Sequence, residues 1–219
     1  MSTELYRSAL SSATDLDGWK VEGPAVTSFP TGRLRLESAA DPADGQAANF
    51  VAWLPVEHDG DLRMSWDFRP LREPGLAMVF WAARARDGGS IHDPALPERT
   101  GEYEQYHSGA IDAYHLSYFR RRWASERSLH TCNVRKSHGF HLVAQGADPL
   151  PAVLDTDRDY HLVLTWTAHT VRFAIDGVTC LTWTDDGSVG GPARRGGAIG
   201  LRQMSPLIAE YSNLLVEAI

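Results

Sequence analysis

The segment YHLVLTWTAHTVRFAIDGVTCLTWTDD, residues 160–186, decides the fold. Within it, runs of alternating apolar and polar residues are separated by turn residues at Ala168 and at Asp176-Gly177. An Asp-Gly pair between two such runs is a strong hairpin signal, because both residues tolerate the positive φ angles of a tight turn. The segment therefore predicts consecutive antiparallel strands joined by short turns.

The same pattern extends outward along the chain. The cleanest alternation is in LRMSWDFR, residues 62–69, where Leu62, Met64, Trp66 and Phe68 share one face. The segment GLAMVFWAA, residues 75–83, is apolar on both faces, as is typical of a central strand. Further predicted strands lie in residues 19–29, 32–38, 50–55, 111–121, 139–145, 198–204 and 209–218, and residues 39–48 are predicted to form a loop.

No segment has the length, period and caps of a helix. Many short strands with glycine turns predict an all-β protein, an antiparallel two-sheet jelly-roll sandwich. Sandwiches of about 220 residues commonly remain undivided, so we expect residues 1–219 to form a single jelly-roll domain.

The composition limits the partners. The net charge of -7 argues against nucleic acid, whose phosphates require a basic face. The N-terminal residues do not form a secretory signal and no apolar stretch could span a bilayer, so we expect a cytoplasmic protein with no membrane partner. In the cytoplasm Cys132 and Cys180 are expected to remain thiols.

Chemistry-bearing residues are concentrated between Glu98 and Lys136. This stretch holds four of the seven tyrosines and the basic run Arg120–Arg122. A local basic cluster on an acidic chain suits a small anionic ligand. The stretch follows a long Gly-, Pro- and Asp-rich segment, residues 84–104, and loops of this length usually bind or cover something.

One predicted strand runs through this stretch. In residues 111–121, Tyr114, Leu116 and Tyr118 share one face, which suits a core, while His115, Ser117 and Arg121 share the other. We expect the polar face to contribute to a groove.

The order of the C-terminal strands resembles the concanavalin A-like lectin and glucanase jelly roll. Five motifs, SWDFRP, EPGLAMVFWAA, ERTGEYEQYHSGAIDAYHLSYFRRR, HTCNVRKSHGFHL and GADPLP, resemble a YesU-like family of bacterial jelly-roll proteins of unknown function. A member of that family is associated with proteins that take up and degrade rhamnogalacturonan, the uronate-rich part of pectin. The resemblance thus implies a cytoplasmic jelly roll in a carbohydrate setting and brings no catalytic pattern.

A lyase acting on such a saccharide must neutralise a uronate carboxylate and supply a base and an acid, which Arg, Asn, Tyr and His side chains can do. The candidates for proton transfer are Tyr106, His107 and His115. The candidates for substrate binding are Arg69, Trp81, Arg99, Tyr103, Arg121, Asn133 and Arg135, with Trp123 as a further stacking ring. For any of these roles, the side chains must face a common hollow that can hold the saccharide.

Other interpretations stay open. A hydrolase needs two facing carboxylates, for which Glu102 and Glu104 are candidates, although solvated loop glutamates are the more ordinary interpretation. His115 could equally be an interior histidine, and the arginines could be solvated or paired.

Three functions follow from these alternatives. Cleavage of uronate-containing oligosaccharides, by a lyase ahead of a hydrolase, is the first expectation. A non-catalytic lectin-like protein is the alternative. Assembly through an exposed sheet, giving a homodimer, is the third.

No cofactor is expected from the sequence. The spacing of His130, His138 and His141 matches no standard zinc pattern, so a metal site is not predicted. The many aspartates are compatible with a structural calcium ion, which the sequence does not locate.

Overall fold

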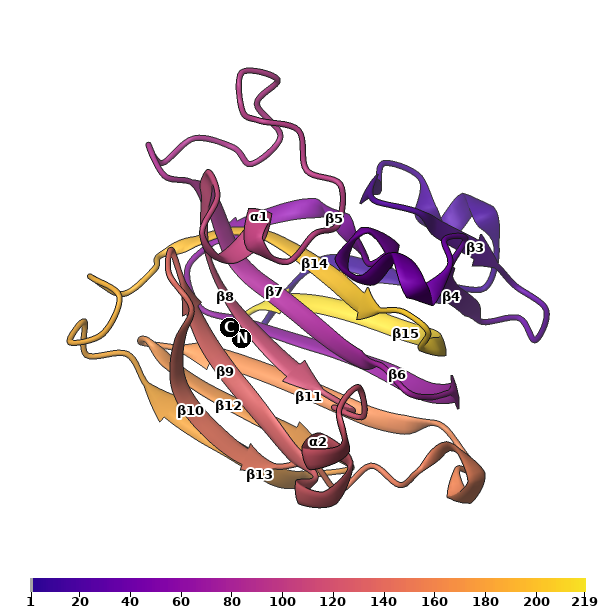
Figure 1. The fold of residues 1–219 in the computed structure, drawn as a ribbon. Coiled ribbons are helices and arrows are strands. Elements are labelled where there is room, and N and C mark those ends of the chain that lie inside the picture. Colours follow the sequence, from indigo (N-terminus) through magenta and orange to yellow (C-terminus); the bar gives the residue numbers. More distant parts are fainter. Residues whose placement is uncertain (1) are drawn as a thin grey trace.

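The computed structural model describes residues 2–219 and shows two antiparallel β-sheets packed face to face (Figure 1). The prediction of an all-β, two-sheet jelly-roll sandwich is confirmed. One sheet has eight strands and the other has seven, and strands that are adjacent in a sheet are often distant in the chain.

The eight-stranded sheet has the order β13-β12-β11-β6-β15-β4-β3, and β1 pairs with β15. Its strands are β1 (Thr3–Ser8), β3 (Ala25–Ser28), β4 (Leu34–Ser38), β6 (Leu62–Arg72), β11 (Tyr160–Thr167), β12 (Thr170–Ile175), β13 (Val178–Thr184) and β15 (Ile208–Ala218). The Asp176-Gly177 pair joins β12 to β13, with φ angles of 49° and 79°. The hairpin prediction is therefore confirmed, since both residues adopt the positive φ of a tight turn.

The seven-stranded sheet has the order β10-β9-β8-β7-β14-β5-β2. Its strands are β2 (Lys20–Glu22), β5 (Phe50–Asp59), β7 (Leu76–Ala85), β8 (Ile111–Tyr118), β9 (Thr131–Ser137), β10 (His141–Ala147) and β14 (Gly196–Met204). In this sheet β8 is flanked by β7 and β9, so the chemistry-bearing stretch of the sequence lies well inside the sheet.

Alternation along the strands builds the core between the sheets. Leu62, Met64, Trp66 and Phe68 of β6 are buried there, as predicted. Tyr118 of β8 reaches them from the other sheet, and its hydroxyl oxygen accepts a hydrogen bond of 3.2 Å from Nε1 of Trp66. Burial of side chains of this size contributes about 1.5–3 kcal/mol each, so the alternation fixes which face of each strand turns inward.

Short helices lie in the connections. They are η1 (Ala13–Leu16), η2 (Pro42–Ala48), α1 (Glu104–His107), α2 (Ala124–Leu129) and η3 (Val153–Asp155). The sequence did not predict them, because three to seven residues are too few to show a helical period. Residues 39–48, predicted as a loop, contain the 3-10 helix η2. Within residues 2–219, none of the helices combines the length and the apolar composition that crossing a bilayer would require.

Two of these helices stand at opposite ends of β8 (Figure 1). The β7–β8 connection, residues 86–110, carries α1, and the β8–β9 connection, residues 119–130, carries α2. The carboxylate of Glu126 accepts the backbone N–H groups of Arg122 and Trp123, both at 3.1 Å, and so caps the start of α2. The β7–β8 and β8–β9 connections border the outward face of the seven-stranded sheet.

Candidate functional site

The site lies on the face of the seven-stranded sheet that points away from the core. Antiparallel register brings a row of residues side by side on this face, because opposed residues in paired strands project in the same direction. The row runs across five strands as Arg202, Met78, Ser117, Asn133 and Gln145. Polar groups therefore lie beside the Met78 side chain on one surface.

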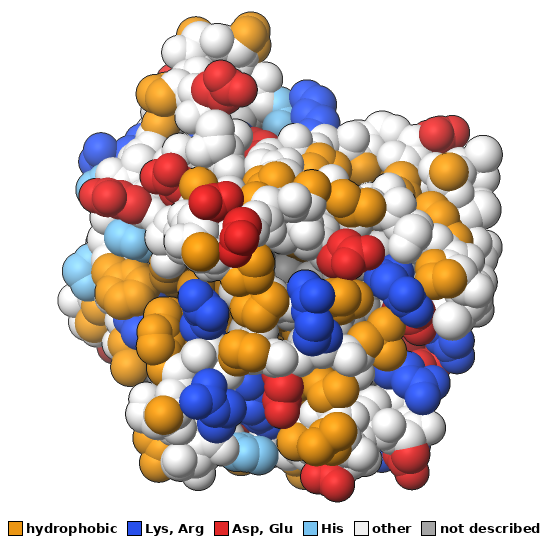
Figure 2. All heavy atoms as spheres, turned by 45° about the vertical axis from the view of Figure 1, so that its right-hand side comes forward, with side chains coloured by type: hydrophobic (Ala, Val, Ile, Leu, Met, Phe, Trp, Pro, Cys, Tyr) orange, Lys and Arg blue, Asp and Glu red, His pale blue; other side chains and the backbone are white. Residues whose placement is uncertain are grey.

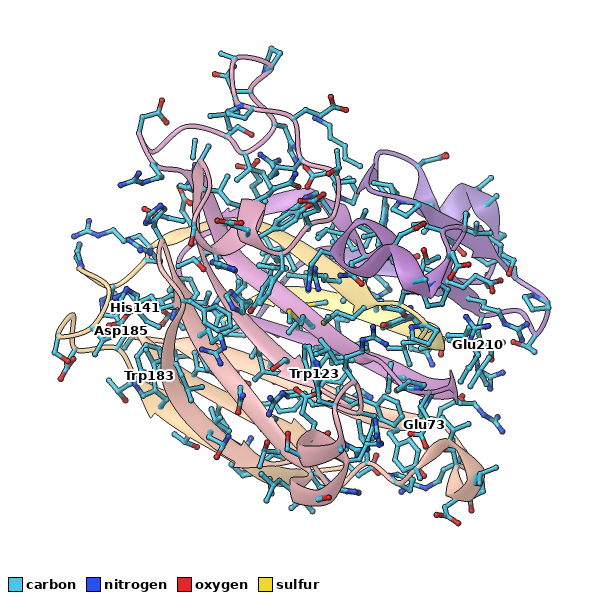
Figure 3. All side chains as sticks on the ribbon, in the orientation of Figure 1. Glu73, Trp123, His141, Trp183, Asp185 and Glu210 are labelled. Atoms are coloured by element: carbon cyan, nitrogen blue, oxygen red, sulfur yellow. The ribbon has the colours of Figure 1, made fainter. Side chains whose placement is uncertain are left out.

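A cavity of about 280 Å³ lies over this row. It is lined by Gln46, Leu76, Met78, Tyr103, Ser117, Arg120, Trp123, Glu126, Asn133, Arg135, Phe140 and Met204. We call this cavity the groove. Figure 2 shows hydrophobic and Lys or Arg side chains side by side over the middle of one face of the molecule. In Figure 3, Trp123 lies over the outward face of the sheet next to α2, and this side chain is 51% exposed.

Tyr103 and His115 form a hydrogen-bonded pair in the wall of the groove. Their hydroxyl oxygen and Nε2 are 2.6 Å apart. Burial lowers the pKa of His115 well below its usual value, and the positive charges of Arg135, His107 and Arg202 lower it further. Burial raises the pKa of Tyr103 to about 12. Near pH 7 both groups are therefore neutral, and the tautomer of His115 determines which of the two donates the hydrogen bond.

The electrostatics of the groove favour an anion. Arg120 pairs with Glu126 at 2.7 Å, so these two charges cancel. Arg135 has its guanidinium 3.7 Å from the centroid of the Phe140 ring and donates to the Phe140 carbonyl at 3.0 Å. No carboxylate in the described part of the chain pairs with Arg135, which leaves one positive charge free to face a ligand.

Four of the predicted site residues meet at the groove. Tyr103, Asn133 and Arg135 line it, and His115 reaches it through its bond to Tyr103. The Asn133 amide lies 3.0 Å from Nη1 of Arg120 and 2.9 Å from Nε2 of Gln145, so it belongs to a polar network across β9 and β10.

His107 lies at the edge of this group. Its ring is centred 4.8 Å from the rings of both Tyr103 and Phe140, and its Nδ1 is 2.7 Å from Oγ of Ser108. It supports the aromatic wall without lining the groove.

Tyr106 and Arg99 lie elsewhere, which corrects their expected placement. The buried Tyr106 hydroxyl donates to Glu22 at 2.7 Å, and burial raises its pKa. Arg99 pairs with the same carboxylate at 2.6 Å. Since Glu22 is on β2, both groups anchor the β7–β8 connection to that strand.

Trp81, Arg121 and Arg69 also lie outside the groove. Trp81 is in the core, stacked on Tyr114 with ring centroids 5.3 Å apart. Arg121 is buried in an ion pair with Asp148 at 3.1 Å. Arg69 is on β6 of the other sheet, 3.9 Å from Asp159. None of the three lines the groove, so the expected common hollow does not include them.

The acidic residues considered for hydrolysis do not line the groove. Glu102 and Glu104 are exposed on the β7–β8 connection, and the groove's own acid, Glu126, is engaged by Arg120 and the start of α2. Cys132 and Cys180 are free thiols, and burial raises the pKa of Cys132 to about 12, which disfavours a nucleophilic thiolate. Among residues 2–219, no three His, Cys, Asp or Glu side chains gather closely enough to hold a metal ion.

Several groove residues were not predicted. Ser117 was assigned to the correct face of β8 but to no role. The others are Gln46, Leu76, Met78, Arg120, Glu126, Phe140 and Met204. Gln46 comes from η2, far away in the sequence, and nothing in its neighbourhood signals a site.

Comparison with known proteins places the fold and the family. The chain is 46% identical to the uncharacterized protein YesU of Bacillus subtilis over 212 residues, covering 97% of this chain and 94% of that protein. A crystal structure of a protein of unknown function with a galectin-like fold, from Bacillus subtilis, superposes with a TM-score of 0.93 at 45% identity, covering 99% and 97% of the two chains.

A more distant likeness shows the fold alone. The carbohydrate-binding module CBM66 from Bacillus subtilis superposes with a TM-score of 0.59 at 12% identity, covering 92% of this chain and 96% of that one.

The family model DUF1961, described as a domain of unknown function, matches residues 3–216. By this match and by the identity to YesU, the chain belongs to the DUF1961 family.

Proposed function

We propose that this protein binds an oligosaccharide containing a uronic acid in the groove, as a lectin-like protein. The observation that carries the proposal is Arg135, a guanidinium that lines the groove and has no carboxylate partner among residues 2–219. A guanidinium can hold a carboxylate through two parallel hydrogen bonds, which makes it suited to the acidic group of a uronate.

The rest of the groove suits a sugar ring. Trp123 offers a flat aromatic face, and a pyranose can stack on such a face while its hydroxyls find polar partners. Ser117 and Asn133 supply hydroxyl and amide groups on the floor. The carbohydrate-binding module CBM66 has the same fold, which agrees with a saccharide ligand.

A pectin-type saccharide of the rhamnogalacturonan class fits this chemistry, because its chain contains uronic acid residues. We infer that a galacturonate residue sits with its carboxylate on Arg135 and its ring against Trp123.

Calorimetric titration with digalacturonate and with the neutral disaccharide galactobiose tests this proposal. We expect binding of digalacturonate that falls at least tenfold in Arg135→Gln, because the charge-assisted hydrogen bonds are lost. Arg172→Gln is the matched control, since Arg172 lies on β12 of the other sheet, where it bonds to Thr179. If digalacturonate does not bind, or if both variants bind like the wild type, the proposal is wrong.

A second candidate function is uronate elimination by the Tyr103–His115 pair. Its support is the 2.6 Å hydrogen bond between these side chains at the groove that carries Arg135. In this reaction a base removes the proton on the carbon next to the carboxylate, the glycosidic C–O bond breaks, the leaving oxygen takes a proton, and a C=C bond forms in the sugar.

The unsaturated product absorbs in the ultraviolet, so its formation from pectic oligosaccharides is easily followed. Elimination predicts turnover in the wild type and its loss in Tyr103→Phe with binding kept. No turnover with intact binding leaves the protein a lectin.

A further inference from the structure

Three hydrogen-bond donors converge on a single oxygen at the end of the groove. Oε1 of Gln46 accepts from Nδ2 of Asn49 at 2.9 Å, from the backbone N–H of Tyr103 at 3.3 Å and from Nη2 of Arg202 at 3.4 Å. The donors come from the residue after η2, the β7–β8 connection and β14, so the arrangement is built by tertiary structure.

Arg202 is the unusual member of this set. It is 0% exposed, and its remaining protein acceptor is the carbonyl oxygen of Gly101 at 3.0 Å. Throughout residues 2–219, no carboxylate pairs with Arg202, and its Nε and Nη1 atoms have no hydrogen-bond partner. The ring of Tyr103 lies 4.8 Å from its guanidinium carbon.

A buried cation without an anion is costly. Removing an ion from water carries a penalty of several kcal/mol that a nearby opposite charge normally offsets. An amide oxygen carries only a partial charge and offsets less than a carboxylate does, since hydrogen bonds to an ionised acceptor are roughly twice as strong. The position of Gln46 Oε1 is therefore one that a carboxylate oxygen would occupy more favourably.

We propose that Gln46 holds the place of a ligand carboxylate, and that a uronate carboxylate replaces its amide oxygen on Asn49, Tyr103 and Arg202. This inference rests on the proposed function and deepens it, because it gives the groove a second anion position besides Arg135. The ligand class it implies is a saccharide with two acidic sugars.

The local structure allows the exchange. Gln46 is exposed and lines the groove, so its side chain can swing into solvent without disturbing the core. It follows Gly45, whose φ of 65° breaks the regular geometry of η2. Asn49 and Arg202 are buried and stay in place to receive the ligand.

Two substitutions of Gln46 test the inference in opposite directions. Gln46→Ala removes the competing amide, so digalacturonate should bind several-fold more tightly, while Tm falls because three donors lose their acceptor. Gln46→Glu supplies the carboxylate from within the chain, so digalacturonate binding should weaken at least tenfold and Tm should rise by about 2–4 °C. Ala47→Glu is the matched control, because it adds the same charge to the exposed neighbouring residue.

The outcomes separate this inference from the proposed function. If the wild type does not bind digalacturonate, the proposed function is wrong, and the Tm of Gln46→Glu alone decides whether the three donors prefer a carboxylate. If the wild type binds and Gln46→Glu and Gln46→Ala have the affinity of Ala47→Glu, the carboxylate does not take the place of Gln46, and the inference is overturned.

Discussion

The Tyr103 hydroxyl lies 2.6 Å from Nε2 of His115, and this contact joins the β7–β8 connection to the centre of the seven-stranded sheet. His115 is 1% exposed, and within residues 2–219 its Nδ1 has no hydrogen-bond partner. The ring is therefore held in its neutral form by its surroundings, and protonation would place a charge next to Arg135 and Arg202.

Stability should fall as the pH drops below about 6.5. The pKa of His115 in the folded chain lies well below 6.5, so the unfolded chain binds the extra proton first. We expect a loss of up to about 1.4 kcal/mol per pH unit from this group. Urea unfolding at pH 7.5 and pH 5.5 measures it. In His115→Gln the free energy of unfolding should change less between the two pH values. The change that remains includes the contributions of His92 and His107, whose pKa values are also lowered by burial. An unchanged slope would contradict this account.

Tyr106→Phe should destabilise the fold and leave ligand binding unchanged. The substitution removes the hydrogen bond that Tyr106 donates to Glu22, at a cost of about 1–3 kcal/mol in the free energy of unfolding. Denaturant unfolding and calorimetric titration with digalacturonate together check the prediction. A variant of normal stability that fails to bind or to turn over substrate would restore the functional role that the sequence suggested for Tyr106.

Breaking the Arg121–Asp148 pair should be severe. Arg121→Met leaves the carboxylate of Asp148, whose pKa burial already raises, without its counter-ion. We expect a loss of about 3–5 kcal/mol, most of which Arg121→Met combined with Asp148→Asn should recover, since no charge is then left buried. Arg63→Met at the exposed Arg63–Glu217 pair is the comparison and should cost roughly 0.2–1 kcal/mol. Equal losses at the two pairs would show that burial of the first does not matter.

Trp123→Ala should weaken sugar binding without weakening the fold. The side chain is 51% exposed and lines the groove, so little packing is lost. Loss of a stacking surface should lower affinity by about 1–2 kcal/mol, roughly 5- to 30-fold. Leu129→Ala at the last residue of α2, 68% exposed and outside the groove, is the control. Fluorescence or calorimetric titration distinguishes the two, and equal affinities would remove Trp123 from the site.

The fold could be predicted from the sequence because alternation is local. The inward residues of β6 and the Asp176-Gly177 hairpin needed no knowledge of distant segments. The outward position of His115 and Ser117 followed from the same rule applied to β8. The homodimer and the structural calcium ion stay predictions.

The differences between the predicted residues and those that line the groove have particular causes. Trp81 is on β7, which is apolar on both faces, so alternation could not tell which face meets the core. Arg121 follows Phe119, whose φ of 45° ends the alternation of β8. Tyr106 lies three residues after Tyr103 across the start of α1, and its contact with Glu22 is 84 residues distant in the chain. Gln46 is of interest because its side chain contacts Arg202, which is 156 residues away in the chain, and no local sequence pattern indicates that contact.

The β7–β8 and β8–β9 connections lie at the two ends of β8, so their sequences can vary without changing the strand between them. Residues 86–110 and 119–130 supply Tyr103, Arg120, Trp123 and Glu126 to the groove, while the core-facing side of β8 belongs to the core between the sheets. Exchanging these two segments between relatives should change the groove's border while Arg135 stays in place on β9, so that one side of the proposed binding surface can be varied independently of the other.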